Sequence, residues 1–205
     1  MASPSQPAPV DGRRLRSERT RRYIIEAYLQ LLRESSKIPT AAQIAERAGY
    51  SVRSIFDRFP DLLALSLAAA DHAFAQANSE AVARDEAADR ATRIRSQVET
   101  RGRTCERWLP LWRVLQVNQH HSPELQRRLR LMRDAVMRRL ELMYRTELSM
   151  LPEPDRRRIL IALESLTDFE SWARMRFEHE LSVEEACAVW VRAIEGLLPP
   201  APAVS

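Results

Sequence analysis

Apolar residues recur at three- and four-residue intervals along most of the chain, which is the spacing that places them on one face of an α-helix. This pattern predicts helices over residues 18–33, 40–48 and 51–59, and a fourth that begins at Pro60, because proline fits the first turn of a helix. No segment of useful length alternates with period two, and no internal repeat is present. We therefore expect an all-α fold of about nine helices.

Beyond the fourth helix the pattern is less uniform. Residues 79–103 are polar and rich in Arg, Ala and Glu, which indicates either a helix with a narrow apolar face or a partly mobile connector. Apolar residues are dense again over 105–117, as in a buried helix. Serine caps and prolines at helix starts then predict helices over 122–148, 155–177 and 182–198.

The segment 40–59 has the spacing of a helix-turn-helix. Ala45 is small enough for two helices to cross closely, and four residues later Gly49 tolerates the positive φ of a tight turn. Six residues after that, Ile55 is placed to lock the second helix into the corner. The other positions of this small core are Ile24, Tyr28, Leu31, Ile44, Ala48, Tyr50 and Phe59. A generic helical hairpin is the alternative.

The net charge of +4 is unevenly distributed. Residues 1–60 contain 11 Lys and Arg against 6 Asp and Glu, whereas residues 61–205 contain 21 against 22. A basic module joined to a nearly neutral body is typical of a protein that binds a polyanion, although a solvated basic surface has the same charge. Together with the helix-turn-helix spacing, the surplus favours DNA binding.

Several other classes of protein are excluded or disfavoured. The four glycines stand alone, so no phosphate-binding loop or dinucleotide fingerprint is present. Cys105 and Cys187 form neither a metal motif nor a disulfide framework, which favours a reducing cytoplasm. No apolar run approaches the roughly 20 residues of a membrane span, and residues 1–10 do not have the apolar centre of a signal peptide.

The sequence also contains no recognisable catalytic motif. His120 and His121 are adjacent and would point about 100° apart on a helix, which makes them a poor metal chelate. No serine or cysteine has a recognisable base, and Cys187 lies in a core-like segment. We therefore expect no enzymatic activity, no cofactor and no metal.

The run from Thr40 to Leu65 resembles the signature of the TetR (tetracycline-repressor) family, and residues 22–32 resemble the first helix of that family. Residues 163–172 and 181–185 are similar to the paired last helices of many members. The resemblance implies a cytoplasmic, homodimeric, DNA-binding transcriptional regulator. Such regulators are usually repressors that a small ligand releases from an inverted-repeat operator.

Four positions depart from the family pattern. Phe56 stands where tyrosine is usual, and Leu62 stands where lysine is usual, so a hydroxyl and a positive charge for phosphate are missing. Arg53 replaces a common glycine, and Arg58 replaces a frequent histidine. These two arginines restore positive charge. Because they replace residues of the family pattern, the operator sequence of a known member cannot be transferred to this protein.

The resemblance assigns DNA contacts to the start of the second helix and to the third helix. The residues are Thr40, Gln43, Ser51, Val52, Arg53, Ser54, Phe56, Asp57 and Arg58. Arg53 is placed either to pair with guanine, since its planar guanidinium can bond both acceptors of that base, or to contact a phosphate. The arginines of residues 13–22 either enter a minor groove or add only non-specific attraction.

The last helix is apolar on more than one face, which a helix facing a single core does not need. We expect it to pair with helix 155–177 in a four-helix homodimer interface, unless both are simply buried within a monomer. The expected interface residues are Ile159, Leu163, Leu166, Phe169, Val183, Cys187, Trp190, Ile194 and Leu197.

The middle of the chain gathers large, soft or amphipathic side chains, which line small-molecule pockets as well as ordinary cores. These residues are Trp108, Trp112, Leu115, Met132, Val136, Met143, Tyr144 and Trp172. With the family resemblance, they are a candidate pocket for a small apolar or aromatic effector.

The expected organisation has four parts. Residues 1–16 form a flexible basic arm, residues 17–65 a DNA-binding domain, residues 66–198 a regulatory and dimerisation domain, and residues 199–205 a tail. The alternatives to a ligand-released repressor are a ligand-independent DNA-binding regulator and a helical protein–protein adaptor.

Overall fold

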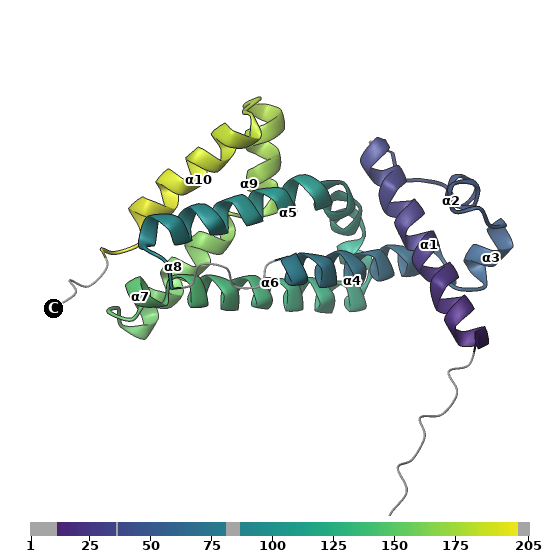
Figure 1. Cartoon of the computed structure of the whole chain (residues 1–205), viewed down its shortest axis with the longest axis horizontal. Helices are drawn as coiled ribbons and strands as arrows, with labels where there is room; N and C mark the ends of the chain where they lie inside the picture. The colour runs from purple at the N-terminus through teal and green to yellow at the C-terminus, as the bar shows by residue number, and fades with distance from the viewer. Residues whose placement is uncertain (1–11, 36, 81–86, 201–205) are drawn as a thin grey trace, which may run out of the picture. The chain divides into compact units, whose positions relative to one another are not determined.

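The computed structural model describes residues 12–35, 37–80 and 87–200 (Figure 1). Within these ranges the regular elements are ten α-helices with two short helical segments, and no strand is present. The expected all-α class is therefore confirmed, with one helix more than the nine predicted. None of the helices in these ranges is both long and apolar enough to cross a membrane.

The chain divides after His72 into two compact units, the N-terminal unit (1–72) and the C-terminal unit (73–205). The division falls inside α4 (Leu62–Glu80), a little beyond the boundary expected after residue 65.

The N-terminal unit contains α1 (Gly12–Glu34), α2 (Ala41–Ala48), α3 (Val52–Phe56) and the first part of α4. Its core is made of completely or almost completely buried side chains, among them Ile24, Tyr28, Ile44, Ile55 and Phe59. The buried Tyr28 hydroxyl is satisfied by Ser66 Oγ at 2.9 Å, which ties α1 to α4.

The C-terminal unit is built around a long central helix, α5, against which α6, α9 and α10 pack, while α8 packs against α6 and α10 (Figure 1). The elements are α5 (Arg90–Asn118), η1 (Gln119–His121), α6 (Pro123–Met143), α7 (Arg145–Leu148), α8 (Glu153–Leu166), α9 (Phe169–Ala173), η2 (Arg174–Glu178) and α10 (Val183–Leu197). Ser122 caps α6 with Pro123 at its first position, and Ser182 with Glu185 forms the predicted capping box of α10.

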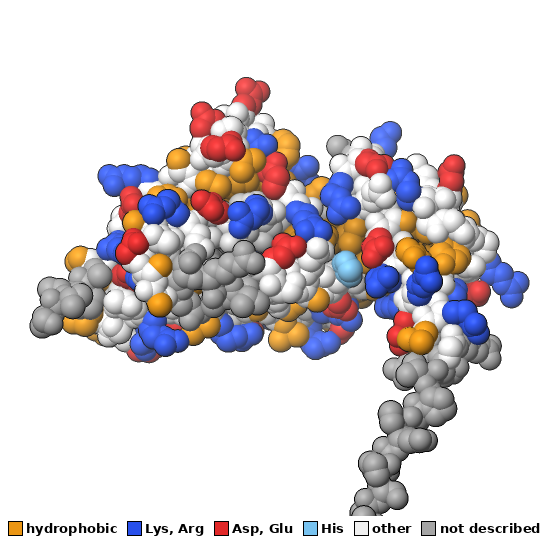
Figure 2. All heavy atoms as spheres, in the orientation of Figure 1, with side chains coloured by type: hydrophobic (Ala, Val, Ile, Leu, Met, Phe, Trp, Pro, Cys, Tyr) orange, Lys and Arg blue, Asp and Glu red, His pale blue; other side chains and the backbone are white. Residues whose placement is uncertain are grey.

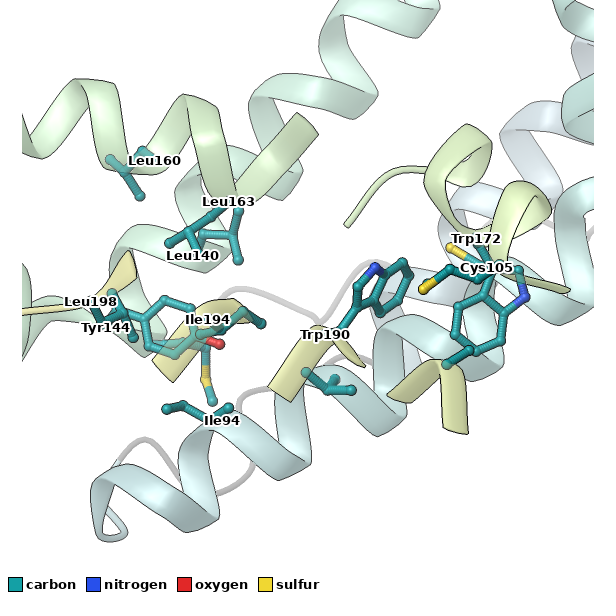
Figure 3. Close-up of a cluster of buried hydrophobic side chains, with 14 of the residues drawn as sticks. Ile94, Cys105, Leu140, Tyr144, Leu160, Leu163, Trp172, Trp190, Ile194 and Leu198 are labelled. Carbon is teal, nitrogen blue, oxygen red and sulfur yellow. The ribbon is translucent and has the colours of Figure 1, made fainter. Parts of the chain in front are cut away.

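The core of this unit places Trp172 and Trp190 together, with ring centroids 4.8 Å apart (Figure 3). Helix α5 comes close to this pair at Gly102, where an added Cβ would lie 3.0 Å from the Trp172 ring and 3.1 Å from Cys187 Sγ. A side chain at this point of α5 would therefore press on Trp172 and Cys187, which would have to move by a few tenths of an ångström.

Two expectations near the N-terminus are wrong. Helix α1 begins at Gly12, so residues 12–16 of the expected flexible arm are helical; residues 1–11 lie outside the described part of the chain. Helix α4 begins at Leu62 rather than at Pro60, because the Asp61 carboxylate accepts a hydrogen bond from the Ala64 amide at 2.7 Å and so caps the helix itself.

Three other segments also differ in extent from the helices predicted from the sequence. The segment 90–118 is one continuous helix. Residues 90–103 are therefore helical and do not form the mobile connector that was one of the two alternatives for residues 79–103. The helix predicted over 155–177 is broken at Thr167, because Asp168 accepts a hydrogen bond from the Ser171 amide at 2.7 Å and starts α9. The helix predicted over 122–148 is interrupted at Tyr144, which separates α6 from α7.

Candidate nucleic-acid interface

Helices α2 and α3 meet at the tight turn that the sequence predicts. Thr40 and Gln43 form a reciprocal capping box at the start of α2, in which the Thr40 amide donates to Gln43 Oε1 at 2.9 Å. Gly49 ends α2 with φ of 73° and ψ of 31°, a left-handed conformation that glycine adopts without steric cost. The Tyr50 amide then bonds the Ala45 carbonyl at 3.0 Å and closes the turn.

Helix α3 is short and is held at its start and at its inner face. The Ser51 side chain accepts from the Ser54 amide at 3.1 Å, which confirms the predicted cap. Ile55 is completely buried, so it anchors the inner face of the five-residue helix. Since an isolated helix of this length is not stable in water, the orientation of α3 depends on these anchors.

Two side-chain contacts connect α2 and the turn after it to α1, and neither was predicted from the sequence. Arg47 makes a bidentate ion pair with Glu34, with N–O distances of 2.9 and 2.7 Å, and this hydrogen bonding lowers the pKa of Glu34. The Thr20 hydroxyl donates to the Tyr50 hydroxyl at 3.3 Å. The first pair joins two helices and the second joins α1 to the turn after α2, so only the charge of Arg47 and Glu34 was visible as a signal in the sequence.

The structure brings the nine predicted DNA contacts together at the start of α2 and along α3. Seven are exposed: Thr40, Gln43, Ser51, Val52, Arg53, Phe56 and Asp57. Ser54 and Arg58 are half-buried. Val52 and Phe56 expose 39% and 45% of their surface. Of the exposed members, Thr40 and Gln43 lie at the start of α2, and the others lie on α3 and its two caps.

The two replacement arginines have different environments. Arg53 is exposed on α3, and no hydrogen bond or ion pair within the described residues involves its side chain. Arg58 is folded back onto α3, where its guanidinium donates to the Ser54 carbonyl at 2.9 Å. Arg53 is therefore available to a ligand, whereas Arg58 already has a partner.

In the face shown in Figure 2, basic side chains lie at several places on the N-terminal unit among apolar and a few acidic ones, and basic and acidic side chains are interspersed over the C-terminal unit. Arg16, expected on the flexible arm, and Arg22 are both exposed on α1, and Arg22 Nε lies 3.5 Å from a carboxylate oxygen of Glu26. A helix that carries these charges presents them at fixed spacing along one rigid element.

The candidate pocket residues lie mostly within the core of the C-terminal unit. Trp108, Leu115, Met143, Tyr144 and Trp172 are buried, and Trp112, Met132 and Val136 are half-buried. The N–H of Trp172 donates to Glu106 at 2.6 Å and that of Trp112 to Glu170 at 2.9 Å, so neither is left to orient a ligand. The Tyr144 hydroxyl, in contrast, is buried without a hydrogen-bond partner.

The expected interface residues fall into two groups. Leu163, Trp190 and Ile194 are completely buried in the core of the chain itself and have no surface left for a partner (Figure 3). The other members are Ile159, Leu166, Phe169, Val183 and Cys187, which are half-buried, and Leu197, which is 38% exposed. Ile161 and Val189, which were not predicted, are exposed on the same two helices, α8 and α10.

The described residues offer little for metal or thiol chemistry. No group of three or more His, Cys, Asp or Glu side chains in these ranges is arranged to hold a metal ion. Burial raises the pKa of Cys105 to about 11, so its thiol is neutral and a poor nucleophile near neutral pH.

Solved structures with this fold are transcriptional regulators. The chain is similar to a transcriptional regulator from Rhodococcus sp. Rha1, with a TM-score of 0.71, 14% identity, and coverage of 89% of this chain and 99% of that chain. It is also similar to a TetR-family transcriptional regulator from Streptomyces coelicolor, with a TM-score of 0.70, 17% identity, and coverage of 88% and 80%. No protein-family model and no curated protein sequence matches the chain. The chain therefore has the fold of a TetR-family regulator.

Proposed function

We propose that this protein is a cytoplasmic, dimeric, DNA-binding transcriptional regulator, of the type that a small apolar or aromatic ligand releases from an inverted-repeat operator. The observation that carries the proposal is α3, a short helix fixed in a helix-turn-helix and presenting an unpaired arginine, Arg53. The basic charge of the same unit and the fold shared with regulators support it.

In this proposal α3 enters the major groove and the start of α2 faces the phosphate backbone. Exposed Ser51, Val52, Arg53 and Asp57 then face the base edges. Thr40 and Gln43 lie where the first amides of α2 point outward, which suits phosphate or sugar contacts, although their side chains are also engaged in the capping box. Phe56 offers an apolar contact without the hydroxyl of the usual tyrosine.

The proposal is tested by selecting bound sequences from a pool of random duplexes with the full-length protein. We expect enrichment of one short inverted repeat, with half-sites about one helical turn apart. Recovery of no preferred sequence, with binding no stronger than to random duplex, would contradict the proposal and favour an adaptor that binds protein.

We predict that Arg53→Ala weakens binding to the selected site by about 1–3 kcal/mol per half-site, if the guanidinium pairs with guanine. The loss should be confined to duplexes that carry the wild-type base at one position of each half-site. Gel-shift titrations against every single-base variant of the site measure this, with Arg130→Gln on α6 as a control that removes the same charge from the C-terminal unit. A uniform loss across all sequences would assign Arg53 to a phosphate instead.

The dimer is proposed from apolar side chains left exposed on the C-terminal unit. Ile161 on α8 is 48% exposed, and Val189 and Leu197 on α10 are 46% and 38% exposed. Exposed aliphatic residues on two neighbouring helices are typical of helix-pair interfaces. Sedimentation at micromolar concentration should give twice the chain mass of 23.6 kDa, and Val189→Glu should shift it toward the monomer. A wild-type monomer would refute the dimer.

Effector release is proposed from the unpartnered Tyr144 hydroxyl. Burial, with the nearby charge of Glu147, raises the pKa of Tyr144 above its usual range, so the group is a neutral phenol able to donate or accept one bond. Helix α4 continues from one unit into the other and so provides a route for coupling. A ligand that quenches tryptophan fluorescence should weaken operator binding about 5- to 150-fold. Quenching without any change in operator affinity would rule out the coupling.

A further inference from the structure

Arg58 and Arg21 are two basic residues of the N-terminal unit whose guanidinium groups contact other groups of the same unit. The Arg58 guanidinium donates to the Ser54 carbonyl at 2.9 Å, and its Nε is buried without a partner. Arg21 donates to the Arg58 carbonyl at 3.3 Å, and its guanidinium carbon lies 4.4 Å from the centroid of the Phe59 ring. Phe59 itself is 1% exposed, so this ring is a fixed point of the core.

We infer that Arg21 and Arg58 are positioning residues, which fix the end of α3 against α1 and thereby set the direction in which the recognition helix presents Arg53. The part of this inference that concerns DNA rests on the proposed function. The part that concerns the order of α3 does not.

Helix α3 is very short. A helix of five residues has few internal hydrogen bonds, and its last carbonyls have no intrahelical partner. A guanidinium at the C-terminal end satisfies one of these carbonyls and places positive charge at the negative end of the helix. Arg58 provides this at Ser54, opposite the end that Ser51 caps.

The contact of Arg58 with Ser54 limits how Arg58 could bind DNA. A bidentate phosphate contact through Nε and a terminal nitrogen is closed to Arg58, because its Nε has no exposed surface and one terminal nitrogen already bonds the Ser54 carbonyl. Arg53, five residues earlier, is exposed and has no described partner. The two arginines of this segment therefore have different roles: Arg53 contacts DNA, and Arg58 stabilises the end of α3.

Arg21 links the segment after α3 to α1. The Asp57 amide bonds the Arg53 carbonyl at 2.8 Å, and the Phe59 amide bonds the Ile55 carbonyl at 2.9 Å, so the chain after α3 is an extension of its last turn. Arg21 contacts this extension twice, by a hydrogen bond to the Arg58 carbonyl and by a cation–π contact with the Phe59 ring. Movement of α3 relative to α1 would break both contacts.

Hydrogen–deuterium exchange on the DNA-free protein tests the order of α3 directly. In Arg58→Gln and Arg21→Gln, amides of residues 55–59 should exchange about 5- to 10-fold faster, the factor expected for the loss of one hydrogen bond. Arg22→Gln removes the same charge from an exposed position of α1 and should leave these amides unchanged. Unchanged exchange in both test variants would overturn the inference.

Binding to the selected site, compared with random duplex of the same length, tests the effect on recognition. Arg58→Gln should lower the ratio of specific to random affinity about 5- to 10-fold and leave the salt dependence of binding unchanged. This ratio does not depend on the folded fraction, so a loss of global stability alone would not move it. A smaller salt slope with an unchanged ratio would make Arg58 a phosphate contact and overturn the inference. A wild-type protein without preference for any sequence would instead refute the proposed function, while the exchange experiment still decides the role of the two arginines.

Discussion

Raising the salt concentration from about 50 to about 200 mM should weaken binding to the selected operator by about 10²- to 10⁵-fold, with a slope of about −4 to −8 in a plot of log K against log salt. The slope reflects counterions released from DNA as Lys and Arg side chains contact phosphates. Arg21, Arg47 and Arg58 already have partners within the chain, so we expect only about two to four phosphate contacts from each copy of the N-terminal unit.

Gel-shift or fluorescence-anisotropy titrations at four or more salt concentrations measure this slope. Arg130→Gln on α6 is a suitable control, because it removes an exposed charge from the nearly neutral C-terminal unit and should leave the slope as it is. Binding that does not depend on salt would contradict a polyanion-binding role for the basic unit.

The helix-turn-helix was predictable because its requirements are local in sequence. Ala45, Gly49 and Ile55 each satisfy a separate steric condition, and their spacing satisfies all three at once. Serine and threonine caps act within three residues of their own position, so they too can be assigned without knowledge of the fold. The structure confirms the left-handed Gly49 and the buried Ile55.

The partners of charged side chains were not predictable in this way. The pair of Arg47 and Glu34 joins α2 to α1, and the contact of Arg21 with Phe59 joins α1 to the segment that follows α3. A sequence gives the number of arginines in a segment, but whether a guanidinium faces solvent or a backbone carbonyl depends on how the helices pack. The surplus charge of residues 1–60 therefore overestimates the charge available to DNA.

Apolar periodicity likewise identified buried faces without identifying their neighbours. Trp190 and Ile194 were expected at a dimer interface because α10 is apolar on more than one face, yet both are completely buried against their own chain. A helix that packs between α5 and α8 needs apolar residues on two sides, and periodicity does not distinguish a second helix of the same chain from a helix of a partner.

A buried ion pair in the C-terminal unit was missed altogether, and its disruption should have the largest effect on stability. Arg93 on α5 pairs with Glu147 on α7, and their side chains are 8% and 0% exposed. Glu147→Ala should lower the free energy of unfolding by about 3–5 kcal/mol, because it leaves the Arg93 charge buried with only the Ala88 carbonyl as a partner. For a chain of this length, the melting temperature should fall by about 6–20 °C.

Urea unfolding followed by tryptophan fluorescence measures this loss in the right part of the molecule, since all four tryptophans lie in the C-terminal unit. Arg158→Ala is the matched control: its pair with Asp155 has an N–O distance of 2.7 Å but is 77% and 50% exposed, so its loss should cost less than about 1 kcal/mol. Replacing both buried partners, as in Arg93→Met with Glu147→Met, should restore most of the stability, because no unpaired charge then remains inside. If Glu147→Ala were no more destabilising than Arg158→Ala, the pair would contribute nothing to the packing of α7 against α5.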